Sequence, residues 1–205
     1  MSVCVIARLS GMPRWQPGAR ERLQATTLEL FVEQGFEQTT VAEIASRAGL
    51  TERTFFRYFA DKREVLFSGQ DEFEGMFLDH IAAAAPDAEP FAVVVKAVRG
   101  VSGEFFPAER LPFSRKRQTI IDAHPGLQER ELLKLSGLTE AMAAALRKRG
   151  TQEPTAVLSA ECGVTIFRVA FSRWVGGSED RELPAIVDEV LAELRVLTAP
   201  HATPP

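Results

Sequence analysis

The stretch Thr39–Leu66, TTVAEIASRAGLTERTFFRYFADKREVL, is the most informative part of this chain. Thr40 and Glu43 have the spacing of a capping box, in which a threonine hydroxyl accepts a backbone N–H and a glutamate reaches back. Apolar residues at helical spacing follow. Gly49 can then adopt a positive φ, which ends the helix in a tight turn. The pattern predicts a short helix that starts after Thr40 and stops at Gly49.

A second short helix is predicted to begin after Thr51, which is a good N-cap residue. Phe55 and Phe59 lie one helical turn apart and can anchor this helix to its neighbours. The other side chains of the segment are then expected on the remaining faces of the helix: Glu52, Arg53, Thr54, Phe56, Arg57 and Tyr58. Upstream, a further apolar stripe predicts a helix that ends at Gly35. The glycine turn favours a helix-turn-helix, and the outward groups suit a helix in the DNA major groove.

These residues resemble the TetR family of bacterial regulators. The resemblance lies in residues 19–66, ARERLQATTLELFVEQGFEQTTVAEIASRAGLTERTFFRYFADKREVL, which are about a quarter of the chain. It implies an all-α homodimer with an N-terminal three-helix helix-turn-helix domain that binds DNA. A C-terminal helical domain for ligand binding and dimerisation follows, and the whole chain has about nine helices.

The resemblance also implies which residues touch double-stranded DNA. Phosphate contacts are expected from Thr40, Thr51, Tyr58 and Lys62, and contacts to bases or nearby phosphates from Arg53, Thr54 and Arg57. Phe56 stands where the family commonly has tyrosine, so packing on sugar remains while a hydroxyl contact is lost. Glu52 is an unusual charge at this place, and it either accepts from a cytosine amine or points sideways.

Each of these residues also has a structural explanation. Tyr58 is about as well explained as a core residue, and Lys62 as a solvated cation at the start of a helix. Arg53 and Arg57 can be ordinary surface charges. The two threonines cap their helices in either case, and a phosphate contact would be an addition to capping.

The distribution of charge favours one local DNA-binding segment over non-specific binding of nucleic acid by the whole surface. The net charge of the chain is −4. Residues 47–63 carry five basic and two acidic side chains, whereas residues 67–205 carry 15 basic and 20 acidic ones. A positively charged segment at 47–63 followed by an acidic remainder would orient the protein on DNA.

Proline breaks and helical periodicity divide the chain into four parts. We expect a flexible N-terminal arm at 1–15, the DNA-binding domain at 16–62, the ligand-binding and dimerisation domain at 63–199, and a flexible tail at 200–205. Arg14 in the arm is a candidate DNA contact. The predicted helices of the third part are 61–84, 89–105, 107–122, 125–149, 154–175 and 180–198.

The last two predicted helices are strongly apolar. In the family these helices pair with their copies as a four-helix interface, and the pattern is consistent with a homodimer. The alternative is a buried core in a monomer, which sequence alone does not separate from an interface. No membrane span is indicated, and a cytoplasmic protein is expected. Cys162 is interpreted as a small buried hydrophobe rather than a redox or metal residue.

A small-molecule effector of unknown identity is the other family expectation. Its pocket is predicted to be apolar with a few polar groups, and the candidate lining residues are Phe77, His80, Phe105, Phe106, Phe113, Gln118, Phe167 and Phe171. We expect no catalytic residues, no metal site and no cofactor, because no catalytic or nucleotide-binding motif was found. The prediction is a repressor released from a palindromic operator by its ligand. The alternatives are an all-α enzyme and an architectural DNA binder without a ligand.

Overall fold

The computed structural model describes residues 18–177 and 181–199. The expected arm at 1–15, with Arg14, and the expected tail at 200–205 lie outside these residues. Within the described ranges the regular structure consists of α-helices and short 3-10 helices, and no strand occurs there. The predicted all-α class is therefore confirmed. The chain divides into two compact units between Val65 and Leu66, and each is described by itself.

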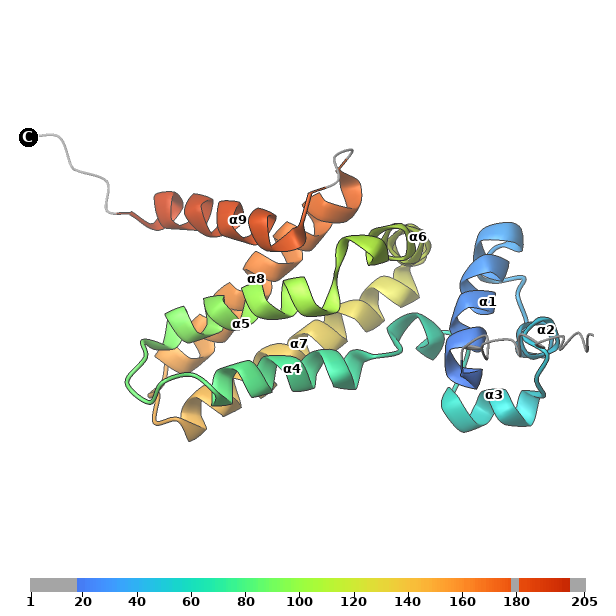
Figure 1. Ribbon diagram of the computed structural model, residues 1–205, viewed down its shortest axis with the longest axis horizontal. Coiled ribbons are helices and arrows are strands. Elements are labelled where there is room, and N and C mark those ends of the chain that lie inside the picture. The colour runs from blue at the N-terminus through green and yellow to red at the C-terminus, as the bar shows by residue number, and fades with distance from the viewer. Residues whose placement is uncertain (1–17, 178–180, 200–205) are drawn as a thin grey trace, which may run out of the picture. The chain divides into compact units, whose positions relative to one another are not determined.

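The described part of the N-terminal unit contains three helices: α1 (Ala19–Gln34), α2 (Val41–Arg47) and α3 (Glu52–Tyr58) (Figure 1). The predicted capping box of α2 is confirmed, because the Thr40 hydroxyl accepts from the Glu43 N–H while the Glu43 carboxylate accepts from the Thr40 N–H. Gly49 has φ 68°, a conformation that side chains disfavour. The Thr51 hydroxyl accepts from Thr54 N–H and caps α3.

One apolar interior holds these three helices together. Leu23 of α1, Ile44 of α2 and Phe55 of α3 are all fully buried. The rings of Phe55 and Phe59 lie 5.5 Å apart, centroid to centroid, so the predicted anchors of α3 do pack side by side. Burial of these side chains fixes which face of α3 is left for solvent or a ligand.

The C-terminal unit is a helical bundle. It comprises α4 (Gln70–Ala82), α5 (Pro90–Phe105), α6 (Leu111–Asp122), α7 (Pro125–Lys148), α8 (Thr155–Gly176) and α9 (Leu183–Thr198), with a 3-10 turn at Ala108–Arg110. A further 3-10 turn, Glu64–Phe67, includes the boundary between the two units. The central helix is α8, which packs against α5, α6, α7 and α9 (Figure 1). Close approach of α8 and α5 depends on Gly163, where an added Cβ would lie 2.2 Å from Val94 Cγ1.

Three predicted helix starts were wrong. The helix predicted from residue 61 begins at Gln70, because Asp61 instead caps the 3-10 turn and Gly69, at φ 91°, redirects the chain. The helix predicted from residue 107 begins at Leu111 after a 3-10 turn, and the last helix begins at Leu183 rather than 180. The end of α4, at Ala82, lies two residues before the predicted end at 84, and the other predicted bounds agree with the structure within one residue.

Among the described residues, one helix, α8, is long enough and apolar enough to cross a membrane. Length and composition do not separate such a span from the core helix of a bundle. The packing of α8 against four other helices favours the core helix.

Candidate nucleic-acid interface

The outward face of α3 is aromatic and basic. Phe56 and Tyr58 keep 55% and 38% of their surface exposed, which is unusual for large rings. Glu52, Arg53 and Arg57 are exposed beside them. Tyr58 is therefore not a core residue, and the alternative interpretation of Tyr58 as part of the core is wrong.

Arg57 and Tyr58 form one joined surface group. The Arg57 Nη2 donates to the Tyr58 hydroxyl at 3.0 Å, and the guanidinium carbon lies 4.9 Å from the centre of the ring. Stacking on the ring holds the cation on this face without a carboxylate to neutralise it. A planar guanidinium with free N–H groups is suited to bind phosphate oxygens or a guanine edge.

The two threonine hydroxyls predicted to touch phosphate are engaged in helix caps. The Thr51 Oγ1 lies 3.2 Å from the Thr54 nitrogen and 3.0 Å from the Thr54 hydroxyl. The Thr40 hydroxyl lies 2.8 Å from the Glu43 carboxylate. The hydrogen bond from the Thr40 backbone lowers the pKa of Glu43, and the bond from its hydroxyl adds to this effect. These caps place the first turns of α2 and α3.

Lys62 has a structural role that the sequence did not indicate. Its ammonium donates to the carbonyl oxygens of Phe36 at 2.6 Å, Thr39 at 2.9 Å and Glu37 at 3.1 Å, and it lies 4.5 Å from the Phe36 ring centre. The segment between α1 and α2 is thus tied to the chain that follows α3. All three N–H donors are used, so a phosphate contact would require Lys62 to give up one of these bonds.

The five basic residues counted in 47–63 are not equally available. Arg47 pairs with Glu33 at 3.0 Å, Arg63 pairs with Asp61 at 2.7 Å, and Lys62 is bound to carbonyl oxygens. Within the described ranges, Arg53 and Arg57 have no carboxylate partner. The positive charge available to a ligand on this face therefore comes mainly from these two arginines.

In the C-terminal unit, seven rings form what we call the aromatic cluster: Phe73, Phe77, Phe105, Phe106, Phe167, Phe171 and Trp174. Their contacting pairs have centroid separations from 5.0 Å to 6.3 Å. Five of the eight predicted pocket residues belong to the aromatic cluster: Phe77, Phe105, Phe106, Phe167 and Phe171.

The other three predicted pocket residues are not members of the aromatic cluster. His80 is 3.2 Å from the Glu104 carboxylate and packs against Gly100. Gln118 donates to Asp122 at 2.8 Å and to Glu131 at 3.3 Å. Phe113 has no ring contact with the aromatic cluster among those described, but it lies beside Arg110, which also contacts two rings of the cluster.

Arg110 is the residue at the aromatic cluster that sequence reasoning missed. Its guanidinium carbon lies 4.2 Å from the ring centre of Phe105, 5.7 Å from Phe106 and 5.9 Å from Phe113. It donates to the Phe105 carbonyl at 3.1 Å and has no carboxylate partner within the described residues. Burial lowers the pKa of Arg110, and the charge of Glu72 opposes that shift. The sequence signal that could have identified Arg110 is its position four residues after the aromatic pair Phe105-Phe106.

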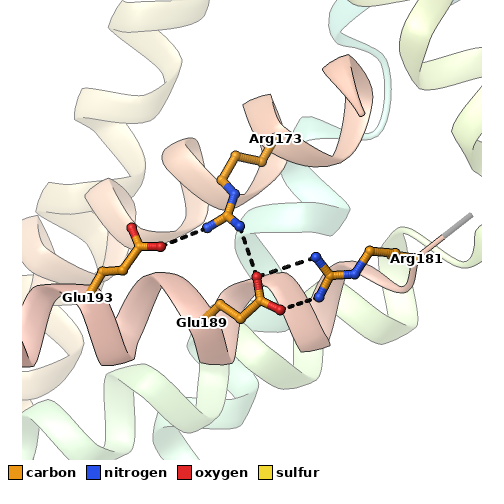
Figure 2. A network of polar contacts seen from close by, with 4 residues as sticks. All are labelled: Arg173, Arg181, Glu189 and Glu193. Atoms are coloured by element: carbon orange, nitrogen blue, oxygen red, sulfur yellow. Dashed lines mark hydrogen bonds and ion pairs between the residues drawn. The ribbon is translucent and has the colours of Figure 1, made fainter. Parts of the chain in front are cut away.

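Four charged residues join α8 to the last helix (Figure 2). Arg173 donates to Glu189 at 2.8 Å and to Glu193 at 3.3 Å, and Arg181 also donates to Glu189. The bond from Arg181 lowers the pKa of Glu189, and the charges of both arginines act in the same direction. The network holds α9 along the end of α8.

Both helices also present apolar side chains to solvent. Leu158 and Val169 of α8 are exposed, as are Val196 and Leu197 of α9.

Cys162 is half-buried, so its interpretation as a buried hydrophobe is wrong. No group of three or more His, Cys, Asp or Glu side chains is placed to hold a metal ion in the described ranges.

Two family models match the chain. Residues 23–68 match the model for bacterial regulatory proteins of the tetR family, and residues 88–198 match the MftR C-terminal domain. The second match alone spans more than half of the chain.

Similar proteins agree with these matches. HTH-type transcriptional regulator TcmR of Streptomyces glaucescens is 37% identical over 41% of this chain, which spans 37% of TcmR. The putative mycofactocin biosynthesis transcriptional regulator MftR of Mycobacterium tuberculosis is 27% identical over 72% of this chain and 73% of its own length.

Two solved structures share the fold. A TetR-family regulator from Syntrophomonas wolfei has a TM-score of 0.61 and 17% identity, covering 87% of this chain and 94% of its own. FadR of Bacillus subtilis, solved with stearoyl-CoA, has a TM-score of 0.58 and 18% identity, covering 88% and 99%. With both family models matched, this chain belongs to the TetR family of bacterial transcriptional regulators, which bind DNA.

Proposed function

We propose that this protein is a repressor that binds a palindromic operator and leaves it when a small molecule binds the C-terminal unit. The observation that carries the proposal is the outward face of α3, with two arginines that have no carboxylate partner in the described ranges and two exposed rings. Burial of Phe55 and Phe59 on the opposite side gives that face one fixed orientation.

In this proposal Arg53 and Arg57 contact bases or phosphates, and Phe56 and Tyr58 pack on sugar and phosphate. Further DNA contacts come from Thr40, Thr51, Glu52 and Thr54, and Lys62 acts first by holding the loop before α2. Arginine at such positions commonly reads guanine through two parallel hydrogen bonds.

The palindrome follows from a homodimer formed through α8 and α9, whose exposed apolar side chains need cover. Two copies of α3 would then meet successive major grooves about 34–36 Å apart, one turn of DNA. Such a regulator acts in the cytoplasm, where the DNA is.

The aromatic cluster with Arg110 is the candidate effector site. Rings and a poorly solvated cation suit a ligand with an apolar part and an anionic group. FadR of Bacillus subtilis was solved with stearoyl-CoA, so we propose an acyl-CoA as the effector class. To empty the operator, the ligand must favour the released state by several kcal/mol, about 5.5 for a complete switch.

Operator binding is tested by fluorescence anisotropy with a labelled palindrome from the upstream region of the gene. Replacement of Arg57 by Ala should weaken binding and lower the slope of log affinity against log salt by about one. Lys96→Ala, which removes an exposed charge from α5, is the matched control and should bind like the wild type. Equal binding by Arg57→Ala would remove Arg57 from the proposed DNA contacts.

The effector is tested separately by adding lauroyl-CoA to the protein–operator complex. Release by lauroyl-CoA but not by free CoA is expected, and Arg110→Met should raise the concentration needed. If operator binding is specific but acyl-CoA has no effect, the effector class is wrong while the operator proposal stands. No release by any small molecule would favour an architectural DNA binder.

A further inference from the structure

One face of α8 has a symmetric order of side chains that no contact among the described residues explains. We call it the α8 outer face, and it consists of Leu158, Glu161, Cys162, Thr165, Arg168 and Val169. Successive members of this set are one or three residues apart in the sequence, so all of them lie on one side of the helix. All are exposed except Cys162, which is half-buried.

The two charges of the α8 outer face have no partner among the residues that the structure describes. Neither Glu161 nor Arg168 makes a hydrogen bond or ion pair there. Arg173, little more than one turn further on, is held by Glu189 and Glu193 of α9 (Figure 2). The outer face thus keeps one acid and one base, two helical turns apart, available to another molecule.

The order of residue types is the same read from either end. Cys162 and Thr165, both small, are innermost. The opposite charges Glu161 and Arg168 lie just outside them, and the apolar Leu158 and Val169 are outermost. All three pairs are nested around nearly the same centre, next to Gly163. A face with this order is complementary to an antiparallel copy of itself.

We infer that α8 crosses α8 of a second copy antiparallel, with Glu161 of each copy paired to Arg168 of the other. This inference rests on the homodimer of the proposed function and specifies how its two-fold axis is placed. An axis of this kind makes residue i of one copy meet residue j of the other, and j meet i. Two ion pairs, two small-residue contacts and two apolar contacts then form at once.

The packing and the charges both favour this arrangement. Small central residues let the two helices approach closely, and the apolar ends cover the ion pairs from water, which strengthens them. A parallel crossing would place Glu161 opposite Glu161 and Arg168 opposite Arg168, and like charges in contact disfavour association. The charge pattern therefore selects the antiparallel direction.

The test is a charge exchange in the full-length protein, with the dimer dissociation constant measured by analytical ultracentrifugation at low salt. Glu161→Arg and Arg168→Glu each replace two attractive contacts per dimer by two repulsive ones. Each variant should raise the dissociation constant about tenfold or more. The double variant restores opposite charges and should return to within about threefold of the wild type.

Matched controls come from exposed charges elsewhere in the same unit, Lys96→Glu of α5 and Glu129→Arg of α7. Both should dimerise like the wild type, and circular dichroism should show equal helix content in all variants. A double variant as weak as the single ones overturns the pairing. Single variants that dimerise normally also overturn it while the homodimer stands, and a monomeric wild type overturns both.

A second measurement does not depend on charge. In a Cys4→Ser background, Thr165→Cys places a thiol opposite Cys162 of the partner subunit and should give a covalent dimer on mild oxidation. Ser172→Cys lies on the same side of α8 but has no cysteine opposite it, and it should stay monomeric on a non-reducing gel. Cross-linking by Ser172→Cys and not by Thr165→Cys would contradict the antiparallel register.

Discussion

In the N-terminal unit, Phe56 and Tyr58 stand on the surface of α3, whereas in the C-terminal unit seven rings pack on one another. The exposed rings contribute little to the stability of their own unit, because much of their surface remains in water. The aromatic cluster, by contrast, is a large part of the core that joins α4, α5 and α8. The difference separates two exposed rings, which are available to a partner, from seven packed rings, which form part of the core at the candidate effector site.

The largest effect is expected where a ring of the aromatic cluster is removed. Phe77 is almost fully buried, so Phe77→Ala should lower the free energy of unfolding by about 3–5 kcal/mol. Phe56→Ala should change it by less than about 0.5 kcal/mol and weaken operator binding instead. Urea unfolding followed by circular dichroism measures both, and equal losses would end the distinction between the two sets of rings.

Lys62 allows the comparison to be made within the N-terminal unit. Lys62→Met leaves three carbonyl oxygens without their donor and should cost about 1.5–3 kcal/mol in unfolding free energy. Arg53→Met, at an exposed position without an ion pair in the described ranges, should leave the melting temperature nearly unchanged while weakening operator binding. A stable Lys62→Met variant with weak operator binding would instead make Lys62 a DNA contact.

Gly163 tests how closely the C-terminal core is packed. Gly163→Ala puts a Cβ against Val94 and should lower the free energy of unfolding by about 1–3 kcal/mol. The matched control is Gly137→Ala in the middle of α7, where the added Cβ meets open space. That variant should gain about 0.5–1 kcal/mol through helix propensity. Thermal melts that rank the two variants the other way would contradict the close contact of α8 and α5.

The smallest effect is expected from acid acting on Glu189. Because the folded-state pKa of Glu189 lies below its ordinary value of 4.5, its contribution is present above that pH. It is lost as pH falls through the folded-state pKa. Glu189→Gln should therefore melt at a lower temperature than the wild type at pH 7, and the gap should narrow as the pH is lowered below 4.5 and Glu189 becomes protonated. A gap that is constant with pH would show that Arg173 and Arg181 do not stabilise the ionised carboxylate.

The helix-turn-helix was predictable because its determinants are local. The capping box of Thr40 and Glu43, the turn at Gly49 and the anchors Phe55 and Phe59 each involve residues within one or two helical turns. Such patterns can be recognised without knowing the rest of the fold. The start of α4 was missed because Asp61 caps a 3-10 turn as readily as an α-helix, and the sequence does not distinguish the two.

What could not be predicted depends on contacts between distant segments. The pairing of Arg47 with Glu33 and the carbonyl contacts of Lys62 span 14 to 26 residues, and they remove two of the five counted cations from the available charge. The local pair of Arg63 with Asp61 removes a third. The same holds for the candidate effector site. Its aromatic residues were identified by type, but only the packing of α4, α5 and α8 shows which of them meet and that Arg110 joins them.

Tyr58 is the one tyrosine in the full sequence, and it lies partly exposed on α3. Any reagent that is selective for phenols, such as a mild nitrating agent, would consequently mark the wild-type protein at a single place on α3. The spectrum of the nitrated ring and its protection by added duplexes would report occupancy of this face without a fluorophore or an engineered cysteine.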